Sequence, residues 1–81
     1  KTSVIFERSS WVNNEPKEGD HLEARIRYHS DIMSGVLTST GPRSRFDFDV
    51  PARGPTPGQL LVLYRGTEVV GGGIIADALV Q

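Results

Sequence analysis

The stretch from His21 to His29, which reads HLEARIRYH, decides the fold class because apolar and polar residues alternate along it. Successive side chains of a β-strand point to opposite faces of the sheet, so this alternation predicts a strand with one buried face. The residues expected to face the core are Leu22, Ala24, Ile26 and Tyr28, and those expected to face outward are Glu23, Arg25 and Arg27. No stretch of the sequence repeats apolar residues at helical spacing for long enough to predict a helix.

Further strands are predicted on both sides of this one. The segment Arg45–Val50 alternates in the same way, with Phe46, Phe48 and Val50 expected inward and Asp47 and Asp49 outward. The segment Leu60–Tyr64 is continuously apolar, which predicts a strand that is covered on both faces. Weaker candidates for strands are Ser3–Phe6, Met33–Ser39 and the glycine-interrupted Val69–Ile75.

Turn residues separate these segments, and the strongest turn is Pro55-Thr56-Pro57-Gly58. A proline at the second position and a glycine at the third fit a type II turn, because the third position needs a positive φ that glycine adopts at low cost. About six short strands separated by such turns predict an all-β fold, a small closed antiparallel barrel. Closure is expected because it removes the sheet edges that a small open sheet would expose.

Composition limits the class of protein. The chain has 81 residues, which suits one domain over 1–81 with a thin core, and it begins at Lys1, so we expect a fragment of a larger protein. It has no cysteine, which excludes disulfides and thiolate chemistry and fits a cytoplasmic origin. No apolar run is long enough to predict a membrane helix. Nine basic and ten acidic residues leave a net charge of −1, so any binding of nucleic acid must depend on a local patch.

The motifs that suggest chemistry each have a simpler structural interpretation. Gly71-Gly72-Gly73 lacks the lysine and the following helix of a phosphate loop, and glycines within a strand more often mark a bulge or a close approach of backbones. His21 and His29 would lie about 26 Å apart on one extended strand, so no metal site is expected. Asp47 and Asp49 share an exposed face, where ion pairs with arginines are favoured over acid–base catalysis. The sequence therefore predicts no catalytic centre.

Four arginines are the candidates for RNA binding. Arg25 and Arg27 would project about 7 Å apart from one strand, and Arg43 and Arg45 lie near each other further along the chain. Together they would form a basic strip that contacts phosphates. The alternative is a solvated barrel face on which Glu23, Asp47 and Asp49 balance the positive charges.

Four motifs resemble those of a known family, in order and in spacing. They are Trp11-Val12-Asn13-Asn14-Glu15-Pro16, Arg25-Ile26-Arg27-Tyr28-His29, Thr56-Pro57-Gly58-Gln59 and Gly71-Gly72-Gly73-Ile74-Ile75. Together they resemble the C-terminal domain of bacterial tRNA-specific 2-thiouridylases, the MnmA (TrmU) family. The resemblance covers almost the whole chain and implies a six-stranded barrel similar to the second domain of translation elongation factors. It also implies that Pro57, Gly58, Gln59 and the three glycines are structural residues.

The resemblance implies that catalysis lies outside this chain. Enzymes of this family use ATP and Mg²⁺ to activate the wobble uridine of tRNAs for lysine, glutamate and glutamine, and they deliver sulfur through a cysteine persulfide. That chemistry belongs to an N-terminal catalytic domain with a phosphate loop and two cysteines. The implied role of this chain is to pack on that domain and help enclose the tRNA anticodon arm. The alternative is a translation-factor-like or protein-interaction barrel that makes no RNA contact.

The sequence also departs from the family pattern on both sides of its turn. Gly54-Pro55 stands where small or branched apolar residues are usual, and Leu60-Leu61 replaces smaller residues. Both changes leave the turn residues intact, and both affect the packing expected around them.

Overall fold

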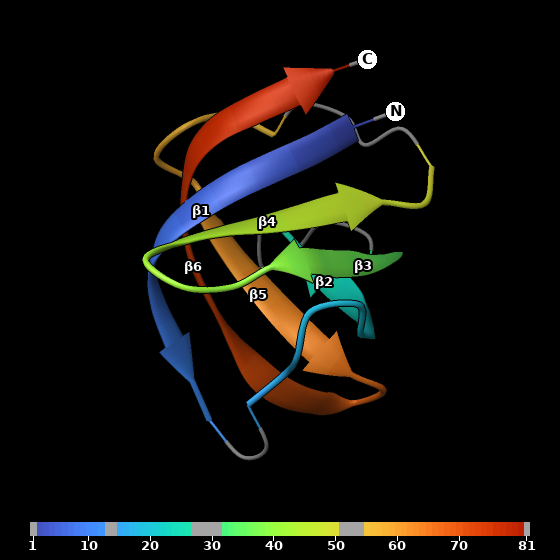
Figure 1. Ribbon diagram of the computed structural model, residues 1–81. Coiled ribbons are helices and arrows are strands. Elements are labelled where there is room, and N and C mark those ends of the chain that lie inside the picture. The colour runs from blue at the N-terminus through green and yellow to red at the C-terminus, as the bar shows by residue number, and fades with distance from the viewer. Residues whose placement is uncertain (1, 13–14, 27–31, 51–54, 81) are drawn as a thin grey trace.

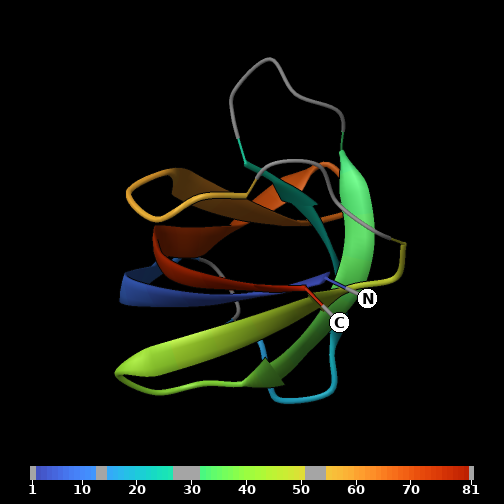
Figure 2. The same ribbon diagram turned by 90° about the horizontal axis from the view of Figure 1, so that it is seen from above.

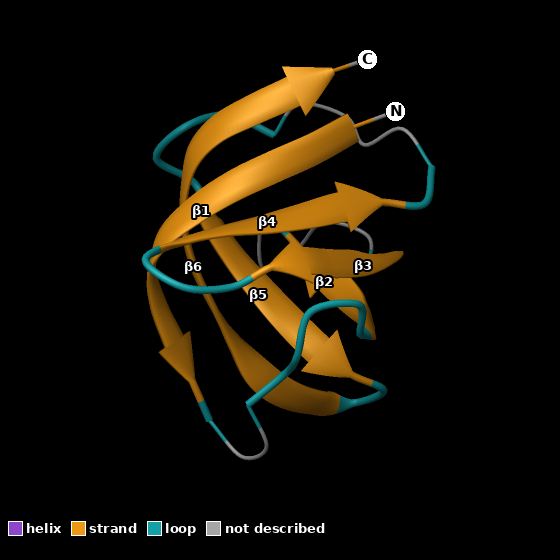
Figure 3. Cartoon of the chain, in the orientation of Figure 1, coloured by secondary structure: helices purple, strands orange, loops and turns teal. Residues whose placement is uncertain are grey.

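The computed structural model describes residues 2–12, 15–26, 32–50 and 55–80 and shows six strands (Figures 1 and 3). The strands are β1 (Thr2–Trp11), β2 (His21–Arg25), β3 (Met33–Ser39), β4 (Arg43–Phe48), β5 (Leu60–Arg65) and β6 (Glu68–Val80). In the part of the chain that the structure describes, no helix is long and apolar enough to cross a membrane.

The six strands close into one barrel in the order β1-β4-β3-β2-β5-β6. Each neighbouring pair is antiparallel, and β1 closes the barrel by pairing with both β4 and β6. Figure 2 shows the strands wrapping around a central axis, and Figure 1 shows the two ends of the chain side by side, where Thr2 pairs with Val80. The predicted all-β, six-stranded closed antiparallel barrel is confirmed.

The core fills the inside of the barrel with apolar side chains from all six strands and from Ile26, which follows β2. Its buried members are Val4, Phe6, Leu22, Ala24, Ile26, Leu37, Phe46, Phe48, Leu61, Leu63, Val70 and Ile75. The inward positions predicted at Leu22, Ala24, Ile26, Phe46 and Phe48 are confirmed. Phe46 and Phe48 meet edge to face, with ring centroids 5.1 Å apart, which is a favourable geometry for aromatic pairs.

Two predictions about buried residues are wrong. Val50 lies beyond the end of β4 and is 59% exposed. The strand stops at Phe48, so the alternation of a strand no longer decides which way the Val50 side chain points. Strand β5 is covered on one face rather than two: Leu61 and Leu63 are buried, whereas Leu60 is 55% exposed. A single barrel provides one inner face, and no second layer covers β5 in the part of the chain described. Arg27, Tyr28 and His29 lie outside the described residues.

The turn spans Thr56–Gln59, one residue later than the predicted Pro55–Gly58, which puts Pro57 at its second position and Gly58 at its third. It leads into β5 and is joined to β6 by hydrogen bonds. Gly58 has a φ of 93°, the left-handed value that the third position of a type II turn requires. The Gln59 amide donates to the Thr56 carbonyl at 3.3 Å, and the Thr56 amide donates to Gln59 Oε1 at 2.9 Å. The Gly58 amide donates to the carbonyl of Ile75, and the Ile75 amide donates to that of Gln59. These bonds place Leu60 opposite Ile74 at the start of β5.

The glycine triplet lies in the middle of β6, where the strand pairs with β1 on one side and with β5 on the other. A Cβ at Gly71 would collide with the carbonyl of Ser10, and one at Gly72 with the carbonyl of Leu61. A Cβ at Gly73 would lie 2.5 Å from the carbonyl oxygen of Glu7. Register shifts interrupt the pairing of β6 with both neighbours in this region. The triplet therefore has the structural role of allowing three backbones to approach closely.

Candidate functional site

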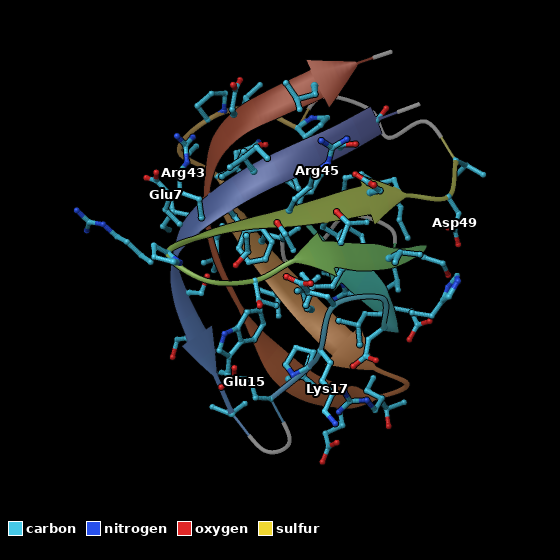
Figure 4. All side chains as sticks on the ribbon, viewed as in Figure 1. Glu7, Glu15, Lys17, Arg43, Arg45 and Asp49 are labelled. Carbon is cyan, nitrogen blue, oxygen red and sulfur yellow. The ribbon has the colours of Figure 1, made fainter. Side chains whose placement is uncertain are left out.

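Arg43 and Arg45 lie on the outer face of β4, but they differ in how they are held (Figure 4). The Arg43 guanidinium, with its side chain 60% exposed, forms an ion pair with Glu7 of β1 at 3.2 Å. Arg45 is less exposed: its Nε donates to Asp47 Oδ1 at 2.8 Å, and its Nη2 donates to Ser3 Oγ at 3.2 Å. Arg43 is therefore the more accessible of the two cations.

Arg25 lies on a different part of the barrel from these two residues. Its guanidinium carbon is 5.9 Å from the centroid of the Tyr64 ring of β5, the geometry of a cation–π contact. Strand β3 separates β2 from β4, and Arg45 pairs with Ser39 at one end of β3 whereas Met33, at the other end, pairs with Ala24. The structure therefore does not bring Arg25 next to Arg43 and Arg45, and Arg27 lies outside the described residues.

Carboxylates accompany most of these arginines on the outer surface. Arg43 pairs with Glu7, Arg45 with Asp47, and Arg65 of β5 with Asp20 at 3.4 Å. The ion pair that Asp47 forms with Arg45 lies within one strand, because the two residues are two positions apart on the same face of β4. On the described surface, positive and negative side chains therefore lie next to each other, in agreement with the net charge of −1.

The sequence analysis missed an apolar groove on the outside of the barrel. Its aliphatic lining includes Leu60 and Val62 of β5, Val69 and Ile74 of β6, and Val12, which follows β1. Gly71, Gly72 and Gly73 also line it, and its volume is about 300 Å³. Leu60, Val12 and Val69 are 55%, 47% and 42% exposed. The continuous apolar sequence of β5 was the sign of this groove, because it places leucine and valine on the outer face of the strand as well as the inner one.

One cation lies on the rim of this groove. Arg8 occupies a bulge of β1, where the register with β6 shifts between Glu7 and Ser10, and its φ is 55°. A positive φ in a non-glycine residue is uncommon and turns the side chain away from the regular alternation of the strand. Arg8 is exposed and lines the groove together with Val12 and Leu60, so the groove combines an apolar lining with one positive charge.

The glycine triplet does not form a nucleotide site. Gly72 pairs with Ser10 on one side and Val62 on the other, in the interior of a sheet rather than at the start of a helix. A phosphate loop needs backbone amides that converge on an anion. The residues of the triplet therefore do not fit ATP and Mg²⁺, and no step of ATP chemistry is assigned to this chain.

Comparison with known proteins gives the same family for nearly the full chain. The family model described as "Aminomethyltransferase beta-barrel domain" matches residues 1–75. The tRNA-specific 2-thiouridylase MnmA of Halorhodospira halophila is 42% identical over 77 residues, which are 94% of this chain and 20% of that protein. The MnmA proteins of Lacticaseibacillus paracasei and Pseudomonas aeruginosa are each 38% identical, over 95% and 94% of this chain and 21% and 20% of their own lengths.

The chain thus spans about a fifth of the length of the curated relatives it matches. The match extends across all four motifs and both sides of the turn, so it covers the barrel as a whole. The chain therefore belongs to the aminomethyltransferase β-barrel domain family, and its predicted resemblance to the C-terminal barrel domain of tRNA-specific 2-thiouridylases is confirmed.

Proposed function

We propose that this chain is the non-catalytic barrel domain of a cytoplasmic, ATP- and Mg²⁺-dependent tRNA 2-thiouridylase. In this role it packs on the catalytic domain and helps to hold the anticodon arm of tRNAs for lysine, glutamate and glutamine while the wobble uridine is thiolated. The observation that carries the proposal is 42% identity over 94% of the chain to a protein that is itself named a tRNA-specific 2-thiouridylase. The barrel fold and the family assignment support the same role.

Among the four candidate arginines, Arg43 is the best placed for contact with a phosphate. Its side chain is 60% exposed, and that of its ion-pair partner Glu7 is 46% exposed, so the pair lies in water. Exposed ion pairs of this kind contribute only about 0–1 kcal/mol, and an RNA phosphate can replace the carboxylate at little cost. Arginine then grips the phosphate with parallel hydrogen bonds, which position RNA without reading its sequence.

Arg45, Arg25 and Arg27 remain candidates with weaker support. Arg45 is held by Asp47 and Ser3, so it would have to break two interactions to reach a phosphate. Arg25 lies over Tyr64, away from Arg43, and would contact a different part of the RNA.

The ion pair between Arg43 and Glu7 offers a matched test in the full-length protein. Arg43→Gln and Glu7→Gln both break the same ion pair, so a purely structural role for the pair predicts that both variants change tRNA affinity in the same direction. A phosphate contact predicts opposite changes: Arg43→Gln weakens tRNA binding, and Glu7→Gln, which removes a competing negative charge, maintains or strengthens it. Filter-binding titrations at one fixed salt concentration measure both. Equal losses of affinity, or no change in either variant, would refute the contact.

A second candidate is a protein-interaction barrel that makes no RNA contact. The net charge of −1 and the carboxylate partners of Arg43, Arg45 and Arg65 favour it. Under this hypothesis tRNA binding by the full-length protein is the same for the wild type and both glutamine variants, and the apolar groove is the functional surface.

A further inference from the structure

Apolar side chains are concentrated on one part of the outer surface. The outward positions of β4 carry Arg43, Arg45 and Asp47, as expected of a strand that faces water. The outward positions at the start of β5 carry Leu60 and Val62 instead. Of the five large hydrophobic residues exposed in the described part of the chain, three (Val12, Leu60 and Val69) line the groove together. Contiguous exposed apolar surface marks an interaction site more reliably than scattered apolar residues do.

We infer that this groove across β1, β5 and β6 is the surface on which the catalytic part of the parent protein docks. The inference rests on the proposed function, because it requires the chain to be one domain of a larger enzyme. The docking face is then apolar, whereas the outer face of β4 is charged. The segment that enters the groove is expected to carry apolar side chains that contact Leu60, Val62 and Val69. It is also expected to carry a carboxylate that forms an ion pair with Arg8.

The length of the relatives identifies the occupant. The matched segment is about 20% of each relative, so some four-fifths of such a protein lies outside this chain and is tethered to it. A tethered partner is present at high effective concentration, so even a modest apolar contact is occupied. The groove is suited to a protein segment, because leucine, valine and isoleucine side chains line it, as in the apolar core of a protein interface.

The chemistry of the groove argues against RNA as the occupant. Its described lining holds one basic residue, Arg8, and one hydroxyl, Ser10, among aliphatic side chains and glycines, whereas RNA contacts depend on several cations or on exposed aromatic rings. Among the described residues that line the groove there is no carboxylate to face Arg8. An acidic residue of the docking segment would complement this charge at the rim of an apolar contact, the usual distribution in protein interfaces.

Carbene footprinting of the full-length protein tests the inference, because it labels side chains in proportion to their exposure. Leu60 and Val69 are expected to be labelled about fivefold less than their exposure in this structure predicts, as for residues that enter an interface core. Ile32, which is 50% exposed outside the groove, serves as the internal reference. Labelling of Leu60 and Val69 as strong as that of Ile32 would overturn the inference.

Two substitution pairs make the test specific. Leu60→Lys should restore full labelling of Val69, whereas Ile32→Lys, which also places a lysine at an exposed aliphatic position, should leave Val69 protected. Arg8→Glu should raise the labelling of Leu60 at least twofold, whereas Arg8→Lys should not. Continued protection of Phe46, which is fully buried, reports that the barrel is folded in each variant. Unchanged protection of Val69 in Leu60→Lys would contradict the inference.

Other occupants give distinguishable results. Protection of the groove that increases with protein concentration would indicate a second copy of the chain, and protection that appears only with tRNA would indicate an RNA surface; either result overturns the inference. Failure of the docking test leaves the effects of Arg43→Gln and Glu7→Gln on tRNA affinity unaffected, so it is separable from failure of the proposed function.

Discussion

At the scale of single residues, Gly58 has a conformation that other residues adopt only at a cost. Its φ of 93° lies in the left-handed region, and a Cβ at this position would meet nothing within 4 Å, so backbone strain alone decides the effect of a substitution. Gly58→Ala should lower the free energy of unfolding by about 1–2 kcal/mol, the cost of a left-handed conformation for a residue with a Cβ. Urea denaturation of the chain measures the loss.

Asparagine provides the control at this position, because it tolerates left-handed conformations better than alanine does. Gly58→Asn should therefore be the more stable of the two variants. A denaturation midpoint for Gly58→Ala equal to or above that of the wild type would show that the turn does not depend on this φ.

At the scale of the strand, β5 tests whether one face or two are buried. Leu61 is fully buried and Leu60 is 55% exposed, although they are neighbours of the same residue type. Leu61→Ala should destabilise the chain by about 2–5 kcal/mol because it leaves a cavity in the core. Leu60→Ala should change stability by about 0.5 kcal/mol or less, as for an ordinary surface position. Thermal or urea unfolding of the pair measures the difference, and equal losses would mean that the outer face of β5 is covered within the barrel itself.

The strands were predictable to different degrees for a physical reason. Where polar residues alternate with apolar ones, as at Leu22–Ile26 and Phe46–Phe48, the pattern names the buried face directly. In Leu60–Tyr64 both faces are apolar, and sequence alone does not distinguish a covered strand from one that exposes an interaction surface. The bulge at Arg8 was not predictable either, because it depends on the register of β1 against β6.

The proposed site was less predictable than the barrel, because it depends on which strands are neighbours. Arg43 and Glu7 are far apart in sequence, and only the pairing of β1 with β4 brings them together. Arg25 and Arg45 are closer in sequence, yet β3 separates their strands. The strand pattern and the family resemblance each predicted the barrel, whereas the groove and the pairing of Arg43 with Glu7 required the fold.

Over the barrel as a whole, the proposed RNA contact and the proposed docking contact lie on different parts of the surface. The charged face around Arg43 is assigned to RNA, and the apolar groove around Leu60 to the catalytic part of the protein. A barrel held by the groove would present its β4 face in a fixed position to a bound anticodon arm. The central claim is that this face contacts RNA phosphate.

The salt dependence of tRNA binding by the full-length protein tests that claim most directly. Each phosphate contact contributes about 0.7–0.9 to the slope of log K against log salt concentration. Arg43→Gln should reduce the slope by about that amount. Arg65→Gln removes a similarly ion-paired arginine on β5 and should leave the slope unchanged. A slope for Arg43→Gln identical to that of the wild type would contradict the account.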